Sequence, residues 1–422
     1  MHESNQGHES EGSPPPLAPP ASPQGTAGAG EPPAAPPEPV AGAREAWAGH
    51  APAPGPALTF ATSSSLEGLA TPPAPVLEGP PIMRGLWTWF TIIAALGIVG
   101  VWRGQAEMAL SVTLAGAFIA AHAADRDPRF TYLHQLLSVV LIGGGAMVFG
   151  MLGFYLVSQP EPGLTRAVAI GIACGGAVLC LLSGLRPIAS TVAATLFRTE
   201  APSRALRVGG RLVMMVLLFA FPGWAAFPDI LDSLAGQAKP LVDTAQLISS
   251  VIGLSVLALG AVGLFVLRDG RAALERLGLR SLKPAHYVVV VLGMVAMTGL
   301  NVGTEALQHR WFPDLWEHDQ RMSHLIAGGL GIGGSLLLGL SAGVGEELAM
   351  RGALQPRLGL WLTALVFASL HVHYSWFGMA TIFMLGVLLG VLRDRTNTTV
   401  AILVHCLYDI SAIVVAGGLS PK

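Results

Sequence analysis

Charge is what this sequence has least of. Asp, Glu, Lys and Arg together make up 12% of its 422 residues, whereas hydrophobic residues make up 52%, and the mean hydropathy is +0.58. A soluble protein of this size needs a more polar surface. The composition therefore excludes a soluble globular enzyme and indicates a polytopic membrane protein whose surroundings are a lipid bilayer.

The sequence also lacks an excess of basic residues and contains few cysteines. The formal net charge of -2 lacks the basic excess of a nucleic-acid-binding protein, so we expect no nucleic-acid partner. The three cysteines, Cys174, Cys180 and Cys406, all fall in apolar segments, so neither a disulfide framework nor a CxxC metal site is supported. The H-E-x-x-H signature of the common zinc proteases is absent as well.

The first 80 residues have a composition of their own. They are rich in Pro, Ala, Gly, Ser and Glu and nearly lack aromatic and branched apolar side chains. Such a segment cannot bury enough apolar surface to fold, and it lacks the basic and apolar regions of a signal peptide. We expect residues 1–80 to be a disordered, solvated tail; a partner-binding tail is the alternative.

From Arg84 onward, apolar runs long enough to cross a bilayer follow one another. The sequence predicts an all-α polytopic membrane protein with about 11 transmembrane helices. It divides into an N-terminal transmembrane region at 84–240 and a C-terminal catalytic helix bundle at 245–420. The predicted spans are 86–103, 106–124, 134–157, 167–185, 211–228, 244–267, 286–306, 323–345, 359–373, 377–393 and 399–417.

Basic residues in two connections predict the orientation. One set lies between the fourth and fifth spans and the other between the sixth and seventh, and the positive-inside rule makes both connections cytoplasmic. The N-terminus is then cytoplasmic, in a multi-pass protein of a bacterial-type cell membrane. The chain around 186–210 is amphipathic and predicts an interfacial helix. The basic residues are Arg186, Arg198, Arg204, Arg207 and Arg211, and Arg268, Arg271, Arg276, Arg280 and Lys283.

Two adjacent glutamates and an arginine follow the long apolar run that ends near residue 345. Glu347 and Arg351 are four residues apart with the acid first, the favourable order for an ion pair on a helix. Glu346 is turned about 100° away from that pair and has no local partner. Ionisable groups at membrane depth are costly and usually functional. We therefore interpret Glu347 and Arg351 as a supporting brace and Glu346 as the reactive acid.

Later spans supply the other polar groups. Phe367 and His371 are four residues apart, and so are His405 and Asp409. Together with Glu346, the two histidines and Asp409 could activate a water or ligate a divalent metal. His373 is about 200° round a helix from His371, so we do not expect the two to share a site. Each of these groups taken alone is most simply interpreted as forming a hydrogen bond between helices. That interpretation is weak for the whole set, because four unpaired polar groups in three neighbouring spans would each need a separate explanation.

Two other motifs compete with this assignment. Residues 339–343 match the G-x-S-x-G nucleophile elbow, but that motif needs a strand-to-helix turn and here lies inside a predicted membrane helix. Residues 329–334 match G-x-G-x-x-G without a preceding strand, so close helix packing explains them better.

The order E-E-x-x-x-R, F-x-x-x-H and H-x-x-x-D resembles the three-motif signature of the CPBP family, the CAAX proteases and bacteriocin-processing or immunity enzymes. The resemblance covers roughly residues 245–420. It implies an intramembrane endopeptidase, similar to type II CAAX prenyl endopeptidases, that acts on a membrane-associated peptide or protein, including prenylated CAAX-type substrates.

The same resemblance implies residue roles. Glu346 would activate the water with His371, while Glu347, Arg351 and Phe367 would support the site. His405 and Asp409 would stabilise the oxyanion, although the commoner residue at the last position is asparagine. A carboxylate cannot donate unless protonated, so Asp409 could instead orient His405 or bind a metal. A divalent metal such as zinc and a purely glutamate-driven water both remain open.

Two other functional classes are alternatives. One is a non-catalytic immunity or scaffold protein of the same family, and the other is a transporter, because intramembrane acids and histidines also form proton relays. The sequence has no pair of corresponding halves typical of transporters, which ranks that class last. Substrate identity and oligomeric state are not predicted.

Overall fold

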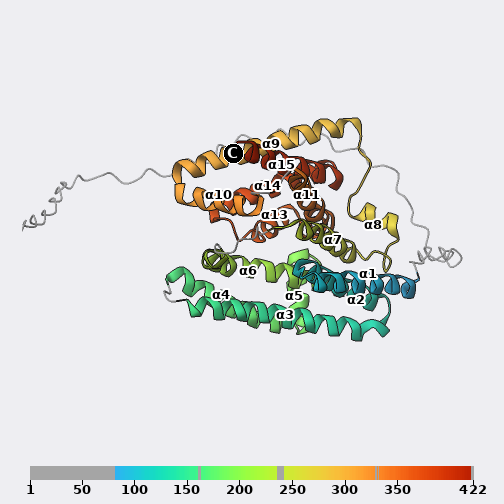
Figure 1. Ribbon diagram of the computed structural model, residues 1–422. Coiled ribbons are helices and arrows are strands. Elements are labelled where there is room, and N and C mark those ends of the chain that lie inside the picture. The colour runs from blue at the N-terminus through green and yellow to red at the C-terminus, as the bar shows by residue number, and fades with distance from the viewer. Residues whose placement is uncertain (1–80, 160–162, 235–241, 328–329, 331, 420–422) are drawn as a thin grey trace, which may run out of the picture. The chain divides into compact units, whose positions relative to one another are not determined.

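A computed structural model describes the backbone of residues 81–159, 163–234, 242–327, 330 and 332–419. The predicted tail, residues 1–80, lies outside this described part of the chain. Within it the protein is α-helical and contains no strand, which confirms the all-α membrane class (Figure 1). The helices are α1 (Ile82–Trp102), α2 (Ala106–Arg126), α3 (Thr131–Ser158), α4 (Leu164–Leu182), α5 (Arg186–Phe197), α6 (Arg204–Leu234), α7 (Thr244–Ala261), α8 (Gly270–Arg276), α9 (Pro284–Trp311), α10 (Pro313–Ala327), α11 (Ile332–Ser341), α12 (Gln355–Leu358), α13 (Leu360–Ser369), α14 (Trp376–Arg395) and α15 (Thr398–Leu419), with a short 3-10 turn η1 (Pro128–Phe130) before α3.

Side-chain caps explain where several of these helices begin. Asp243, Asp269 and Ser375 precede α7, α8 and α14, and each side chain accepts a hydrogen bond from a backbone N–H in the first turn. Such caps satisfy donors that have no partner within the helix. A helix also forms at α5, where the sequence predicts an amphipathic one.

Eight helices in the described residues are long and apolar enough to cross a membrane. They correspond to eight of the predicted spans. The other three differ: the span predicted at 323–345 is divided between α10 and α11, the span at 359–373 is the ten-residue α13, and the last is α15, whose described apolar part is Thr398–Ala412.

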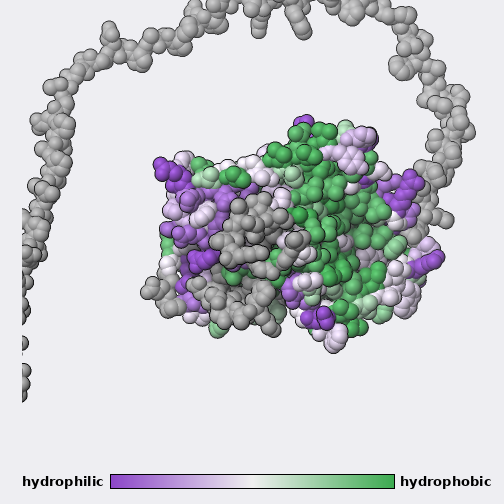
Figure 2. Space-filling view, turned by 45° about the horizontal axis from the view of Figure 1, so that its top comes forward, coloured by the Kyte–Doolittle hydropathy of each residue, from purple (hydrophilic) through white to green (hydrophobic). Residues whose placement is uncertain are grey.

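Large apolar side chains cover the outside of these helices. Trp87, Val101 and Phe154 are examples, each more than 60% exposed. Figure 2 shows a broad continuous hydrophobic area on one face, with hydrophilic residues gathered toward two opposite edges. A water-soluble protein does not expose apolar surface on this scale, so lipid is the solvent for this face.

Helix α2 packs along α7 and so connects the first helices of the chain to the later ones. Trp89 of α1 belongs to the same apolar cluster, and its indole N–H donates to the carbonyl of Leu264, 2.6 Å away. Beyond α7, helix α15 contacts α9, α11 and α14, while α13 packs against α14 and α6. Helix α15 also contacts the segment 342–354, which carries Glu346, Glu347 and Arg351.

Candidate active site

The two glutamates lie on a backbone that is wound more loosely than an α-helix. After α11 the chain forms two π-helical segments, η2 (Ala342–Glu346) and η3 (Leu348–Leu354), with Glu347 between them. π-helical turns are rare and occur frequently at functional sites. The sequence predicts a helix here, but the pattern of apolar residues contains no signal for the change of winding.

A glycine lets this segment approach α15. A Cβ atom added to Gly343 would lie 2.4 Å from Cys406 Sγ and 2.7 Å from the Cys406 backbone nitrogen, so a larger residue does not fit without movement. Because the two backbones come this close, the glutamates are brought beside the part of α15 that carries His405.

The ion pair expected between Glu347 and Arg351 is present. Glu347 Oε1 lies 3.0 Å from Arg351 Nη1, and both residues are completely buried. Arg351 Nη2 also donates to the carbonyl of Gly386 on α14, and its guanidinium lies 4.5 Å from the ring centroid of Phe367 on α13. The pair therefore connects the π-helical segment to two further helices.

Glu347 has a second contact that sequence reasoning did not find. His405 Nδ1 lies 2.9 Å from Glu347 Oε1, and His405 Nε2 lies 3.4 Å from Asp409 Oδ2. The imidazole therefore stands between two carboxylates, an arrangement in which both ring N–H groups of a protonated histidine donate. Glu347 and His405 are 58 residues apart, so no local spacing could have revealed this contact.

Glu346 differs from its neighbour. Its side chain is partly exposed, and it forms no hydrogen bond or ion pair with any residue that the structure describes. Its charge nevertheless acts on both His405 and Asp409. Of the two adjacent acids, Glu346 is thus the one free to interact with a substrate or water.

His371 does not lie on a helix, which corrects the predicted span 359–373. Helix α13 ends at Ser369, and a turn follows up to Ser375. The rings of His371 and His373 lie 5.7 Å apart, so the helical argument that separated them fails. His371 Nδ1 donates to the Phe367 carbonyl over 2.8 Å, which leaves Nε2 as the acceptor nitrogen.

Phe367 lies between the two candidate histidines. Its ring centroid is 4.9 Å from that of His371 and 6.2 Å from that of His405. Phe367 is buried, and Arg351 covers one of its faces. The Phe367 ring therefore separates His371 from His405 and holds both beside the Glu347–Arg351 ion pair.

Asp319 of α10 holds the turn that carries His371. Asp319 Oδ1 accepts a hydrogen bond from the Ser375 backbone N–H at 2.6 Å, and Oδ2 accepts from Ser375 Oγ and from Gln308 Nε2, each at 2.7 Å. His318 Nε2 lies 3.1 Å from the carbonyl of His373 and donates to it. Asp319 was not singled out from the sequence, because its partners Ser375 and Gln308 are far from it or on another helix.

The predicted metal ligands do not form a metal site in this arrangement. Among the described residues, no group of three or more His, Cys, Asp or Glu side chains is placed to hold one ion. His405 and Asp409 approach each other, but His405 is already flanked by Glu347. Glu346, His371, His405 and Asp409 as placed here therefore do not fit a shared divalent metal, and we derive no chemical step through one.

Ser341, the serine of the G-x-S-x-G match, has a structural role. It is buried at the end of α11, and its hydroxyl donates to the carbonyl of Leu247 on α7 at 2.8 Å. It stands in a helix and not at a strand-to-helix turn, so it does not form a nucleophile elbow.

Comparison with known proteins gives two matches. Residues 329–411 match the family described as type II CAAX prenyl endopeptidase Rce1-like. An uncharacterized protein of Bacillus subtilis (strain 168), YpbD, is 29% identical over 159 residues, which cover 37% of this chain and 81% of that protein. No solved structure matches the chain. The family resemblance predicted from the three motifs is confirmed, and the matched residues include all four candidate catalytic positions.

Proposed function

Because its C-terminal region is similar to the Rce1-like type II CAAX prenyl endopeptidases, we propose that this chain is an intramembrane endopeptidase. It hydrolyses a peptide bond of a membrane-associated substrate. The observation that carries the proposal is the carboxylate of Glu346, which is unpaired among the described residues and whose charge reaches His405 and Asp409, while its neighbour Glu347 already pairs with Arg351 and His405. An unpaired acid at membrane depth is costly, and a chemical role accounts for its presence.

Glu346 acts as the general base. It removes a proton from a water molecule, whose oxygen attacks the carbonyl carbon of the substrate. His371 accepts the second hydrogen bond of that water through Nε2, because its Nδ1 is held by the Phe367 carbonyl. Glu346 then returns the proton to the leaving nitrogen as the C–N bond breaks. A positioned base of this kind contributes about 10²- to 10⁴-fold to the rate.

His405 stabilises the oxyanion of the tetrahedral intermediate. Glu347 accepts a hydrogen bond from Nδ1 and so favours the protonated imidazole. The N–H of Nε2 can then donate to the oxyanion of the tetrahedral intermediate. Asp409 is 3.4 Å from Nε2, a long contact that a substrate oxyanion can replace. In this scheme Asp409 orients His405 and does not itself donate.

The family description suggests which substrate to test first. A prenyl endopeptidase cuts next to a lipid-modified cysteine, so a farnesylated C-terminal peptide is the first substrate to test. Exposed apolar side chains close in sequence to the site residues, Leu340, Leu370 and Leu407, suit a substrate that arrives through the bilayer.

The test compares purified wild-type protein, Glu346→Gln and Glu107→Gln with that peptide in liposomes, with mass spectrometry of the products. Glu107 is an exposed glutamate of α2 and provides the matched change outside the site. We expect cleavage by the wild type and Glu107→Gln and none by Glu346→Gln. Cleavage by Glu346→Gln at the wild-type rate contradicts the proposal.

Substrates without a prenyl group require a second measurement. Peptides released from membranes of cells carrying the wild type or Glu346→Gln are compared by proteomics. A set of peptides that depends on Glu346 supports the endopeptidase. No difference in either assay favours the non-catalytic scaffold of the same family.

A further inference from the structure

The start of α6 carries a row of arginines that the proposed proteolysis does not use. Arg204, Arg207 and Arg211 are spaced by three and four residues, which places them on one face of the helix. Their exposure decreases along the row: Arg204 and Arg207 are half-buried, and Arg211 is only 6% exposed. The row therefore leads from the surface into the protein.

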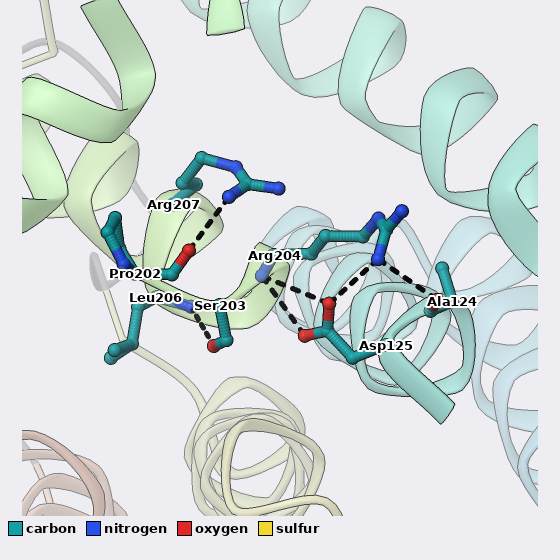
Figure 3. Close-up of polar contacts among 7 residues, drawn as sticks. All are labelled: Ala124, Asp125, Pro202, Ser203, Arg204, Leu206 and Arg207. Atoms are coloured by element: carbon teal, nitrogen blue, oxygen red, sulfur yellow. Dashed lines mark hydrogen bonds and ion pairs between the residues drawn. The ribbon is translucent and has the colours of Figure 1, made fainter. Parts of the chain in front are cut away.

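The first two arginines have local partners (Figure 3). Arg204 Nη1 lies 3.0 Å from Asp125 Oδ1 at the end of α2, and its backbone N–H donates to the same carboxylate. Arg207 Nη1 donates to the carbonyl of Pro202 at 2.8 Å. That second contact is to an uncharged carbonyl, and Arg207 forms no ion pair with any residue that the structure describes.

Arg211 is held by the end of α4. Its Nε and Nη2 donate to the carbonyl of Ser183, at 3.0 and 2.8 Å, which satisfies an acceptor left open at the helix C-terminus. Its Nη1 is buried and has no hydrogen-bond partner in the described part of the chain. A buried guanidinium nitrogen without an acceptor is costly, and charged groups cost most.

A second buried nitrogen faces the same row. His134 of α3 feels the charges of Arg204, Arg207 and Arg211, and its Nδ1 is buried without a partner among the described residues. Arg186, at the start of α5, acts electrostatically on Arg207. Three guanidinium groups of α6 thus act on His134, Arg186 of α5 acts on one of them, and Asp125 is the carboxylate whose charge acts on both His134 and Arg207.

We infer that this arginine row, with His134, binds a phosphate-bearing anion, and that the anion is the headgroup of an acidic phospholipid. A phosphate supplies the acceptor that Arg211 Nη1 lacks and a negative charge for Arg207, and arginine is well suited to it. The site would bind lipid independently of the proposed peptide hydrolysis.

The apolar surroundings favour a lipid over a free ion. Both elements that flank the row expose large apolar side chains close in sequence to its contact residues: Tyr132, Leu133 and Leu136 beside His134, and Leu182 and Leu185 beside Ser183. Acyl chains of a lipid would cover these side chains, while its headgroup met the arginines. Arginines at the ends of membrane spans attract acidic headgroups in this way.

The experiment titrates the purified full chain in detergent with phosphatidylglycerol, phosphatidylcholine or inorganic phosphate, and follows binding by native mass spectrometry. Arg207→Gln is the main variant, because the hydrogen bond it loses is local to its own segment. We expect phosphatidylglycerol to bind more tightly than phosphatidylcholine, and Arg207→Gln to weaken it roughly fivefold. The double variant Arg207→Gln/Arg211→Gln should weaken it further.

Arg129→Gln is the matched control. Arg129 lies just beyond α2, but its charge is paired with Asp127 at 2.6 Å, so its removal should leave phosphatidylglycerol binding unchanged. Equal binding of phosphatidylglycerol to wild type and Arg207→Gln overturns the inference. Binding of inorganic phosphate that depends on Arg207, without preference for phosphatidylglycerol, overturns the lipid assignment and supports an anion site. If the double variant does not fold, the binding measured for Arg207→Gln alone decides the test.

Discussion

Two clusters of buried charge lie in different parts of this protein, and they are organised in opposite ways. Around α15, Arg351, Glu347, His405 and Asp409 form a chain of contacts in which positive and negative groups alternate. At the start of α6, positive groups gather and buried nitrogens of Arg211 and His134 stay without a partner among the described residues. In the first cluster the charges pair with one another, although Glu347 Oε2 and Arg351 Nε are also buried without a hydrogen-bond partner among the described residues, whereas in the second positive charge is in excess. We call the first the completed cluster, because its charges pair within the protein, and the second the incomplete cluster, because its positive groups outnumber its carboxylates.

The largest expected effect on stability comes from a substitution in the completed cluster. Glu347→Ala removes the partner of Arg351 and the acceptor for His405, and leaves a completely buried arginine charge unpaired. Loss of one partner of a buried ion pair costs about 3–5 kcal/mol of stability. Thermal unfolding of the purified protein in detergent measures this loss.

The exposed pair between Arg271 and Glu275 on α8 is the control for that change. Glu275→Ala should alter stability by less than about 1 kcal/mol, since exposed pairs contribute little. Equal unfolding temperatures for Glu347→Ala and wild type would refute the structural role given to the buried pair.

A second substitution is expected to separate the π-helical segment from α15, the two elements that carry the completed cluster. Gly343→Ala places a methyl group against Cys406 and forces the π-helical segment away from α15. We expect a loss of about 1–3 kcal/mol and a marked fall in cleavage rate. Gly299→Ala on α9 is the control, because a Cβ there meets nothing within 4 Å. A fully active Gly343→Ala protein would show that this close approach is not needed.

A third change releases the turn that carries His371. Asp319→Ala removes the acceptor for Ser375 and Gln308 and is expected to cost about 1.5–3 kcal/mol, as for hydrogen bonds to charged groups. Because the turn positions His371, kcat should fall more than KM rises. Steady-state kinetics decides this, and an effect confined to KM would assign Asp319 to substrate binding instead.

Ser341→Ala distinguishes the proposed chemistry from a serine protease. The loss of one buried hydrogen bond to the Leu247 carbonyl should cost about 1 kcal/mol, and cleavage should persist. Unfolding and cleavage are measured on the same preparation. Abolished cleavage with an unchanged unfolding temperature would restore Ser341 as a nucleophile.

The smallest expected effect concerns the incomplete cluster. Arg207→Gln removes a positive charge from a crowded row, so lipid-free protein should keep its stability within about 0.5 kcal/mol. Unfolding in detergent with and without phosphatidylglycerol tests this. The wild type should be stabilised more by the lipid than the variant. Strong destabilisation of lipid-free Arg207→Gln would mean that other protein groups already balance the positive charge of the arginine row.

The sequence predicted what depends on composition and on regular spacing. Long apolar runs located eight membrane-crossing helices, and the four-residue spacing located the ion pair between Glu347 and Arg351. The motif order predicted the family resemblance that residues 329–411 show. These signals are local, so they can be read without knowledge of how the helices pack.

Features that depend on packing could not be predicted in the same way. The early end of α13 and the π-helical winding around Glu347 depend on tertiary contacts that override helical periodicity. The contact of His405 with Glu347 and the hold of Asp319 on Ser375 join residues more than 50 positions apart. The membrane orientation and the catalytic roles of Glu346, His371, His405 and Asp409 stay predictions.

The central claim is that two adjacent glutamates have separate tasks, and the most direct measurement compares Glu346→Gln with Glu347→Gln in cleavage rate and unfolding temperature. We predict that Glu346→Gln loses about 10²- to 10⁴-fold in rate and unfolds at the wild-type temperature. Glu347→Gln should unfold at a clearly lower temperature. A Glu346→Gln protein that cleaves at the wild-type rate, or a Glu347→Gln protein as stable as the wild type, would contradict this division.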